Sequence, residues 1–547
     1  MTNFKRNLIV ISMLLFGIAG AAFAQSLDNK GNDFYMAFMP NFDSNVNIQV
    51  HLTSETTTDV TVQYPANSPT FNQTVTVNPG AITIVSLPIT PSAGWTPGVV
   101  QDNLVRAFGA DEFVAYMINI RPFSSDAALA LPVDTYNTEF LVMSYFSTTV
   151  STDRSEFAVV SAFDNTNVTI TPKAPLAGGF PANVPFTITL NQGEGFLAQG
   201  TTFGSAGDLT GSLVESDKPI SMTNGNICTN VPPNQTFCDH IFEVAQPTQT
   251  WGNRSLVQNL TNNPQGAVYR VLASQDNTSL ELDGSVVATL NKGEFFETNR
   301  LPGSHEFLAD KPIFVTQFMT GVNPGSGDPA MGNQIPPDQY QNAYTFSTVG
   351  GNQFIQHFVN IIAENGDVGS ILLDGSPLAG GLFSPIGSSG YSAATVQISD
   401  GTHSTSSPNG HGITVYGVNN DDSYIYPGGA LFNFINPVGD ANPPICDINI
   451  NGDQANGSAI DNRPSEDTNG NGDLDSSEDL NNNGQIDEDT GIFFLVLDAG
   501  SNNVTLNVDP FVPGDGVVNY SVSVIDNSLP ASGVIRATDG AGNTCTS

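Results

Sequence analysis

Three short sequence words recur in the same order along this chain, and this internal repeat is the feature that most constrains its fold. The first copy comprises Asp-Asn-Thr at 164–166, Leu-Asn-Gln-Gly-Glu at 190–194 and Asp-Lys-Pro-Ile at 217–220. The second comprises Asp-Asn-Thr at 276–278, Leu-Asn-Lys-Gly-Glu at 290–294 and Asp-Lys-Pro-Ile at 310–313. A period of roughly 100–110 residues is too long for a solenoid repeat or one propeller blade, and it suits a small β-sandwich.

Weaker copies flank these two, one beginning near Thr57 and one running from Leu372 to Tyr416. Two patterns favour strands: β-branched residues alternate, as in Val-Thr-Ile-Thr at 168–171, and turn signals recur every roughly 8–12 residues. No segment has helical periodicity. We therefore predict an all-β chain of tandem repeated β-sandwich-like units. Their approximate bounds are 31–133, 134–243, 244–340 and 341–432. The sequence leaves open whether the units stand apart or close into a ring of blades. We expect the three recurrent words to be structural signals for turns and strands.

The charge balance is strongly acidic because bases are scarce. The chain has 15 Lys and Arg against 53 Asp and Glu, for a formal net charge of −38, although only 12% of its residues are charged. This excludes a nucleic-acid partner, which needs a basic footprint. Frequent Gly (53) and Pro (35) argue against a helical bundle, while 39% hydrophobic residues suffice for buried cores.

Residues 1–24 have the pattern of a secretory signal peptide. Lys5 and Arg6 precede an apolar run that ends at Ala21, and Ala22-Phe23-Ala24 forms a cleavage site. The alternative, a membrane anchor, is disfavoured because the run is short. We expect a secreted or cell-surface protein, bacterial in its signal and composition, with no transmembrane segment in the mature chain.

The four cysteines fit an oxidising destination and allow three pairings. We favour Cys228–Cys238 as a local staple and Cys446–Cys545 as a bridge that brackets a C-terminal domain. The alternative for Cys238-Asp239-His240 is a metal site, but its spacing is poor for zinc.

A series of further words runs in a fixed order through residues 31–432. They include Asp33 to Asn41, Leu129 to Pro132, Ser155 to Val160, Cys238 to His240, Gly327 to Met331, Pro336 to Tyr340, and Asp421 to Tyr424 followed by Tyr426 to Gly429. The set resembles the N-terminal domain of the IgGFc-binding protein family. That family is named for a mucus-associated animal protein that binds the Fc region of immunoglobulin G. The resemblance implies a binding role, but it supplies no residue-level Fc motif, and the cysteine-rich von Willebrand-type modules of that protein are missing here.

A separate signal for calcium lies near the C-terminus, where residues 467–489 hold eight carboxylates and no base. The first twelve residues match an EF-hand calcium loop, with Gly472 at the sharp turn. The oxygen ligands of this loop are Asp467, Asn469, Asn471, Asp473, Asp475 and Glu478.

A second, weaker loop follows without a gap. Its ligands are Asp479, Asn481, Asn483, Gln485 and Asp487, with Glu488 or Asp489 replacing the missing acid at Thr490. Directly abutting loops resemble thrombospondin type 3 calcium repeats. The alternative is a flexible acidic linker. We predict that calcium is the cofactor.

The residues around this run favour strands, and Ala537 to Thr544 resembles the last strand and turn of bacterial Ig-like domains. We therefore predict a linker at 433–444 and then an Ig-like β-sandwich at 445–547. The calcium-binding run 467–490 is an insertion in this sandwich.

The search for catalytic motifs finds no nucleophile elbow, no C-x-x-C and no P-loop. His305-Glu306 begins like a zincin helix, but Ala309 stands where the second histidine is required. His403 and His411 read as loop residues. Carboxylates are numerous enough for a glycosidase pair, yet nothing singles one out. The sequence therefore predicts no enzyme.

The combined features favour an extracellular binding or adhesion protein that recognises a protein or glycan through its tandem β-domains. One alternative is a structural surface or matrix component, marked by calcium-dependent self-assembly. Another is a secreted hydrolase, marked by a deep cleft between repeats with two carboxylates about 5–10 Å apart.

The calcium loops generate a first prediction. Chelation with EDTA lowers the melting temperature of the C-terminal domain, because an ion that binds only the native state stabilises it by mass action. Glu478→Gln removes the bidentate ligand of the first loop and weakens that site strongly. Differential scanning calorimetry of the mature chain measures both effects, and an unchanged transition in EDTA contradicts the assignment.

Overall fold

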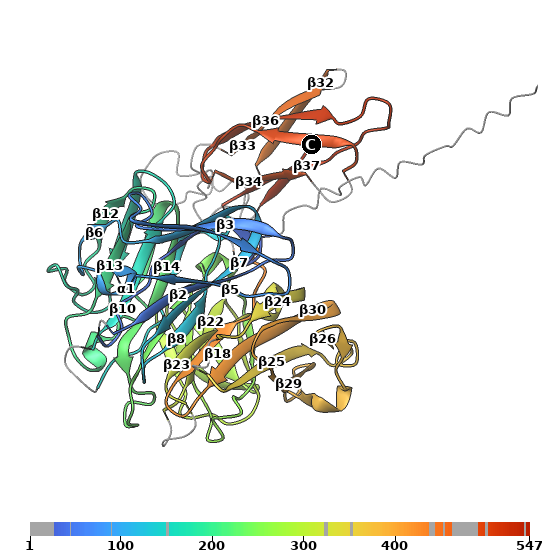
Figure 1. The fold of residues 1–547 in the computed structure, drawn as a ribbon. Coiled ribbons are helices and arrows are strands. Elements are labelled where there is room, and N and C mark those ends of the chain that lie inside the picture. The colour runs from blue at the N-terminus through green and yellow to red at the C-terminus, as the bar shows by residue number, and fades with distance from the viewer. Residues whose placement is uncertain are drawn as a thin grey trace, which may run out of the picture.

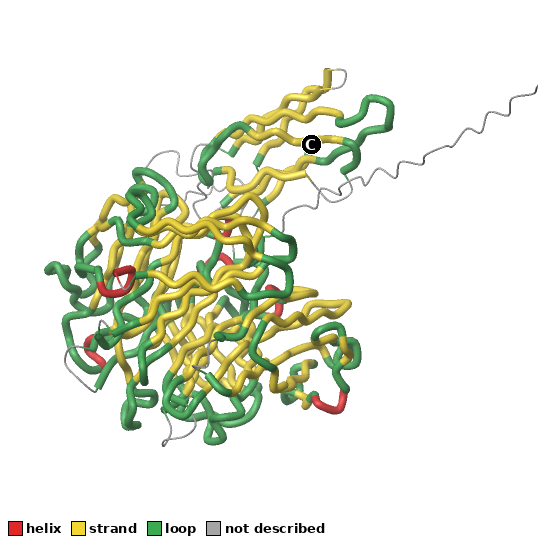
Figure 2. The backbone as a smooth tube through the Cα atoms, in the orientation of Figure 1, coloured by secondary structure: helices red, strands yellow, loops and turns green. Residues whose placement is uncertain are grey.

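The computed structural model describes residues 27–547, except 44, 89, 149–152, 322–326, 351–353, 437–443, 452–453, 462–490, 498–500 and 541–542. The expected signal peptide and calcium run therefore lie outside the described residues. Strands dominate what is described (Figure 1, Figure 2), which confirms the all-β prediction.

Four consecutive units repeat one arrangement of seven main strands. The first contains β1 (Gly31–Met36), β2 (Asn47–Thr53), β3 (Thr58–Tyr64), β4 (Phe71–Val77), β5 (Thr83–Leu87), α1 (Thr90–Ala93), β6 (Val100–Gln101), β7 (Val105–Ile120) and β8 (Asp126–Leu129). The second contains η1 (Val133–Thr135), β9 (Asn137–Leu141), β10 (Ser155–Ser161), β11 (Thr166–Thr171), β12 (Phe186–Leu190), β13 (Gly195–Gln199), η2 (Ser205–Gly207), β14 (Leu213–Thr229) and β15 (Asp239–Val244).

The other two units follow the same order. The third contains η3 (Thr248–Thr250), β16 (Arg254–Val257), β17 (Val268–Ala273), β18 (Thr278–Leu282), β19 (Ser285–Leu290), β20 (Phe295–Glu297), β21 (His305–Ala309), β22 (Ile313–Met319) and β23 (Ala330–Gln334). The fourth contains η4 (Pro337–Gln339), β24 (Gln341–Ser347), β25 (Gln356–Glu364), β26 (Leu372–Leu373), β27 (Ser376–Pro377), η5 (Gly380–Leu382), β28 (Ser384–Pro385), β29 (Tyr391–Ile398), β30 (Thr402–Val418) and β31 (Ser423–Pro427).

A long strand shared by two sheets makes each unit a sandwich. In the third unit this strand is divided into β21 and β22, which belong to two four-stranded sheets, β16-β21-β18-β19 and β20-β17-β22-β23. The division falls at the Asp-Lys-Pro word, 310–312. In the second unit the same word lies within β14, where the pairing register with β9 shifts between Glu215 and Ile220. Proline has no backbone N–H to donate to a neighbouring strand, so strand pairing is interrupted at the Asp-Lys-Pro word. The long strand bends there and passes from one sheet to the next.

The three recurrent words meet in space as one hydrogen-bonded clamp. In the second unit, Asp164 Oδ1 accepts the Gln192 N–H (3.1 Å) and the Asp164 carbonyl accepts Lys218 Nζ (2.6 Å). In the third, Asp276 makes the same two bonds with Lys292 and Lys311. The expected structural role of the words is confirmed.

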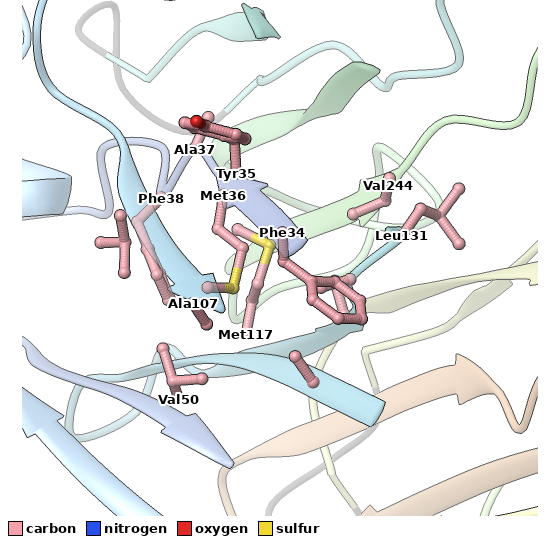
Figure 3. Packing of buried hydrophobic residues seen from close by; sticks show 14 of the residues in the cluster. Phe34, Tyr35, Met36, Ala37, Phe38, Val50, Ala107, Met117, Leu131 and Val244 are labelled. Carbon is pink, nitrogen blue, oxygen red and sulfur yellow. The ribbon is translucent and has the colours of Figure 1, made fainter. Parts of the chain in front are cut away.

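The last strands of the four units pack around a common axis. β8 contacts β15 and β31, and β23 contacts the same two strands, so the four strands form a closed ring. The units are therefore blades of one body rather than separate sandwiches. Figure 3 shows the consequence for the core of the first unit, where Val244 of β15 joins Phe34 and Met117 in one cluster.

One buried carboxylate lies at the centre of this ring. Asp126 accepts the N–H groups of Ala127 (2.8 Å), Phe242 (3.2 Å) and Met331 (3.4 Å), and also that of Ile425. It thus binds the last strand of every unit. Burial raises the pKa of Asp126 well above its usual value, and the four N–H donors oppose that rise.

The two ends of the ring are joined to each other. The Phe432 N–H donates to the Leu27 carbonyl (2.9 Å), and Asp28 and Leu431 form an antiparallel bridge. Beyond it, Asn433 and Asn436 are hydrogen-bonded to Gln339 and Gln249, so the first residues of the expected linker lie against the ring.

The C-terminal strands form a two-sheet sandwich, drawn apart from the four units in Figure 1. One sheet has the order β32-β33-β36-β35 and the other β34-β37-β38. The strands are β32 (Ile445–Asn451), β33 (Gln454–Ile460), β34 (Ile492–Leu497), β35 (Val504–Val508), β36 (Val517–Val524), β37 (Ile535–Asp539) and β38 (Thr544–Thr546). Residues 462–490 lie between β33 and β34. The Gly491 N–H donates to Asp461 Oδ2 (2.8 Å), which holds the two ends of that segment together.

The central carboxylate generates the second prediction. Asp126→Ala leaves buried N–H groups of four strands without their acceptor and lowers the free energy of unfolding by about 3 kcal/mol or more. Asp126→Asn retains one carbonyl oxygen and costs less. Asp111→Ala, at an exposed position of the same unit, is the matched control. Urea titrations followed by circular dichroism give the comparison, and equal stability of all three variants contradicts a central role for Asp126.

Candidate binding cleft between the second and third units

A cleft of about 590 Å³ lies between the second and third units. Its walls include Phe146 and Phe295, and Lys173 and Glu294 stand at its rim. Arg270, Asp208 and Glu297 form its charged floor. It combines aromatic surface with a few fixed polar groups, a mixture typical of binding sites.

Arg270 organises the cleft although its side chain is only 1% exposed. It forms ion pairs with Asp208 (2.9 Å) and Glu297 (2.7 Å), which come from the second and third units respectively. Its guanidinium also donates to the Ser144 carbonyl (2.6 Å), and it lies 3.9 Å from the centroid of the Tyr145 ring. Burial opposes the charge of Arg270, but the two carboxylates outweigh it and hold the guanidinium pKa above its usual value.

The local register shows that this arginine is an addition of the third unit. Arg270 pairs with Thr316 and Glu297, and the corresponding positions in the first two units are His51 and Ala158. A charged residue in a central strand survives only when its hydrogen bonds are satisfied. Here the neighbouring second unit supplies most of the hydrogen bonds of Arg270, so the cleft forms only when the units pack together in the ring.

The cleft has the feature that we expected of a hydrolase, two carboxylates between repeats. Asp208 and Glu297, however, both contact the same guanidinium. This arrangement neutralises a buried cation, and it gives the carboxylates a structural role at the junction of two units.

Both expected disulfides are formed, Cys228–Cys238 and Cys446–Cys545. The alternative metal site at Cys238 fails for a chemical reason. Asp153 lies near both sulfurs of the first disulfide, the only group of possible metal ligands found in the described ranges, but disulfide sulfur is not a thiolate ligand. The predicted calcium ligands between 467 and 489 lie outside the described residues.

The histidines singled out in the sequence have structural roles. His305 Nδ1 contacts Asp283 (2.7 Å), and His403 Nδ1 contacts Asp374 (2.8 Å). Each pair ties the start of a long strand to the Asp-Gly turn of a neighbouring hairpin. His403 and His411 lie in the strand β30 and not in a loop, so that expectation was wrong, and burial lowers the pKa of His411 to about 4.

Sequence reasoning missed a set of buried acids that open the last strand of each unit. They are Asp126, Asp239, Asp328 and Asp422. The signal was available in the sequence, because each acid stands shortly before a proline that lies at the end of the strand or two to three residues beyond it, at Pro132, Pro247, Pro336 and Pro427. Because the spacing varies between units, the pattern becomes evident only when the strands are superposed.

These features define a class, a disulfide-bonded all-β protein whose repeated units close around one axis. Within the described ranges, no helix is long and apolar enough to cross a membrane. The family model described as IgGFc binding protein matches residues 126–417, and the chain belongs to that family. The human IgGFc-binding protein is 23% identical over 421 residues, which cover 74% of this chain and 8% of the human protein. The chain thus corresponds to a small part of that relative, and the resemblance found in the sequence words is confirmed.

The cleft generates the third prediction. Arg270→Met leaves two carboxylates facing each other across a unit boundary and lowers the free energy of unfolding by about 3–5 kcal/mol. Arg270→Lys retains little of this stability, because a lysine ammonium group cannot reproduce the planar, forked guanidinium group of arginine. Arg106→Met, which breaks the more exposed pair with Asp33, costs about 1 kcal/mol or less. Denaturant titration ranks the three variants, and similar losses for Arg270→Met and Arg106→Met contradict the structural assignment.

Proposed function

We propose that this chain is an extracellular binding protein whose four-unit ring recognises a protein or a glycan. Membership of the IgGFc-binding protein family carries the proposal. The human relative is named for binding IgG Fc, and we carry over the binding role while leaving the identity of the ligand to experiment.

The architecture supports this function because it supplies a rigid support for loops. The ring is closed by its own ends and held by a shared axial carboxylate, so its connecting loops are fixed relative to one another. A preorganised surface loses little conformational entropy when it binds. The cleft at Arg270 and the loops around the axis are the surfaces best suited to a partner.

We further propose that the C-terminal domain is stabilised by calcium. The loops at 467–478 and 479–490 supply the carboxylate and amide oxygens that Ca²⁺ prefers. The hydrogen bond between Gly491 and Asp461 supports this role, because it brings together the two residues that flank the stretch containing the predicted loops.

The fourth prediction tests binding directly. Residues 25–547 are applied to a protein and glycan array that includes human IgG Fc and mucin, once with Ca²⁺ and once with EDTA. We expect specific, saturable binding to at least one ligand, and loss in EDTA where the C-terminal domain contributes. A blank array contradicts the proposal. Calcium-dependent assembly by light scattering then favours a matrix component, and release of reducing sugar from array glycans favours a hydrolase.

A further inference from the structure

The internal repeat allows the second and third units to be compared strand by strand. The word Leu-Asn-Gln-Gly-Glu leads directly into β13, and its counterpart Leu-Asn-Lys-Gly-Glu leads directly into β20, so these two strands are equivalent. Arg270 lies opposite Glu297 in the third unit, where Ala158 lies opposite Leu197 in the second. A charged pair has thus replaced an apolar pair at the same position of the sheet.

In the second unit, the edge of β13 is covered by the first unit. The strand β6 pairs with β13, and the Gly98 N–H donates to the Leu197 carbonyl (2.9 Å). Trp95, from the same segment as β6, is buried against Gly195, since a Cβ on that glycine would lie 3.0 Å from the indole ring. The first unit therefore supplies a short strand and a large aromatic side chain to this edge.

The equivalent edge of β20 is open. β20 ends its four-stranded sheet, and within the described residues it pairs with β17 alone. The Thr298 N–H donates to the Tyr269 carbonyl of β17 (3.0 Å). Because hydrogen-bonded positions alternate along an antiparallel pair, the backbone groups of Phe295 and Glu297 are directed away from β17. Their N–H and C=O groups are available to a further strand.

The edge is open because the second unit has a shorter connecting segment at this place. Residues 200–212, between β13 and β14, correspond to residues 88–104, between β5 and β7. The shorter segment forms no strand at β20 and contributes Asp208 to the wall of the cleft. The cleft of about 590 Å³, which Phe295 and Glu297 also line, thus takes the place that β6 and an indole ring fill at the preceding junction.

We propose that β20 binds an extended segment of a protein partner, which adds to the sheet as β6 adds to β13. This inference rests on the proposed binding function and assigns it a surface and a kind of ligand. In such strand addition, backbone hydrogen bonds supply affinity, and the pockets that receive alternate side chains supply selectivity. The repeat itself identifies the occupant, because the equivalent edge of the second unit is paired with an extended segment of another unit.

The walls of the cleft define the side chain that the partner brings. Phe146 and Phe295 are half-buried and offer apolar ring surface, where an indole ring fills the equivalent place at the preceding junction. The two carboxylates of the floor are paired with Arg270, so a charged side chain would have to compete with these ion pairs. A segment with a large apolar residue fits the cleft best.

A glycan explains less of this edge. Sugar hydroxyl groups can bind the carboxylates of the floor, but they do not match the regular spacing of backbone donors and acceptors along a strand. An extended peptide satisfies the open edge and fills the cleft with one side chain.

The fifth prediction tests strand addition with peptides. A phage-displayed library of random dodecapeptides is selected on residues 25–547, and enriched peptides are synthesised. We expect a large apolar residue flanked by residues that favour strands. N-methylation of the alternate amides that face β20 removes their N–H groups and weakens binding by about tenfold or more, whereas N-methylation of the intervening amides has little effect.

Two variants at one position locate the binding at β20. Phe295→Leu removes the ring and keeps the edge N–H, whereas Phe295→Pro also removes the edge N–H, a change that edge strands tolerate. We expect the affinity for the peptides to fall about threefold with Phe295→Leu and about tenfold or more with Phe295→Pro. The matched control is Val286→Ser, which changes a 64% exposed apolar residue on the edge strand β19 of the same unit and leaves binding unchanged.

Melting temperatures show whether each variant is folded, and the N-methylated peptides test the same pairing on the unaltered chain. Selection that enriches no peptide, equal binding of both N-methylated sets, or full binding to folded Phe295→Pro overturns the inference. So does an array glycan whose binding Phe295→Leu weakens, since the cleft would then be a sugar site. An array ligand that binds both Phe295 variants like the parent leaves the proposed function intact and removes only this surface.

Discussion

The hydrogen bonds of one buried carboxylate connect all four units of this protein. Asp126 accepts N–H groups from its own strand and from the last strand of each other unit. Inner strands that converge on an axis have backbone donors facing inward, and a donor buried without an acceptor is costly. Glu243 has a related role, since its carboxylate accepts N–H groups of Val244, Leu129 and Asn333. Acidic residues thus join the ring where a hydrophobic core alone would leave polar backbone unsatisfied.

Much of the remaining architecture follows from how each unit delivers its last strand to the axis. The long strand of each unit pairs first within one sheet and then within the other. In the second and third units, the Asp-Lys-Pro word lies where this strand changes sheets. The same word is anchored by its lysine to the Asp-Asn-Thr turn. Local signals therefore fix the bend, and the bend places the last strand on the axis. Contacts such as those of Arg270 then lock one unit to the next and leave a cleft between them.

The contacts between units also shape the surface of the ring. At Arg270 the charges of two units balance, so the cleft is stable and preorganised.

The sequence by itself determined the β-class, the repeat and the roles of the three words, because these depend on local turn chemistry and alternation. It allowed three cysteine pairings, and the structure decided for Cys228–Cys238 and for Cys446–Cys545, which are 99 residues apart. It also identified the family through an ordered series of short motifs. Only the tertiary structure decided that the units close into a ring. Asp126 and Met331 are separated by 205 positions, and no local pattern specifies such a pair. The same holds for Arg270 with Asp208, which come from different units. Each is an ordinary residue in its own segment, and the two line one cleft only when the second and third units meet.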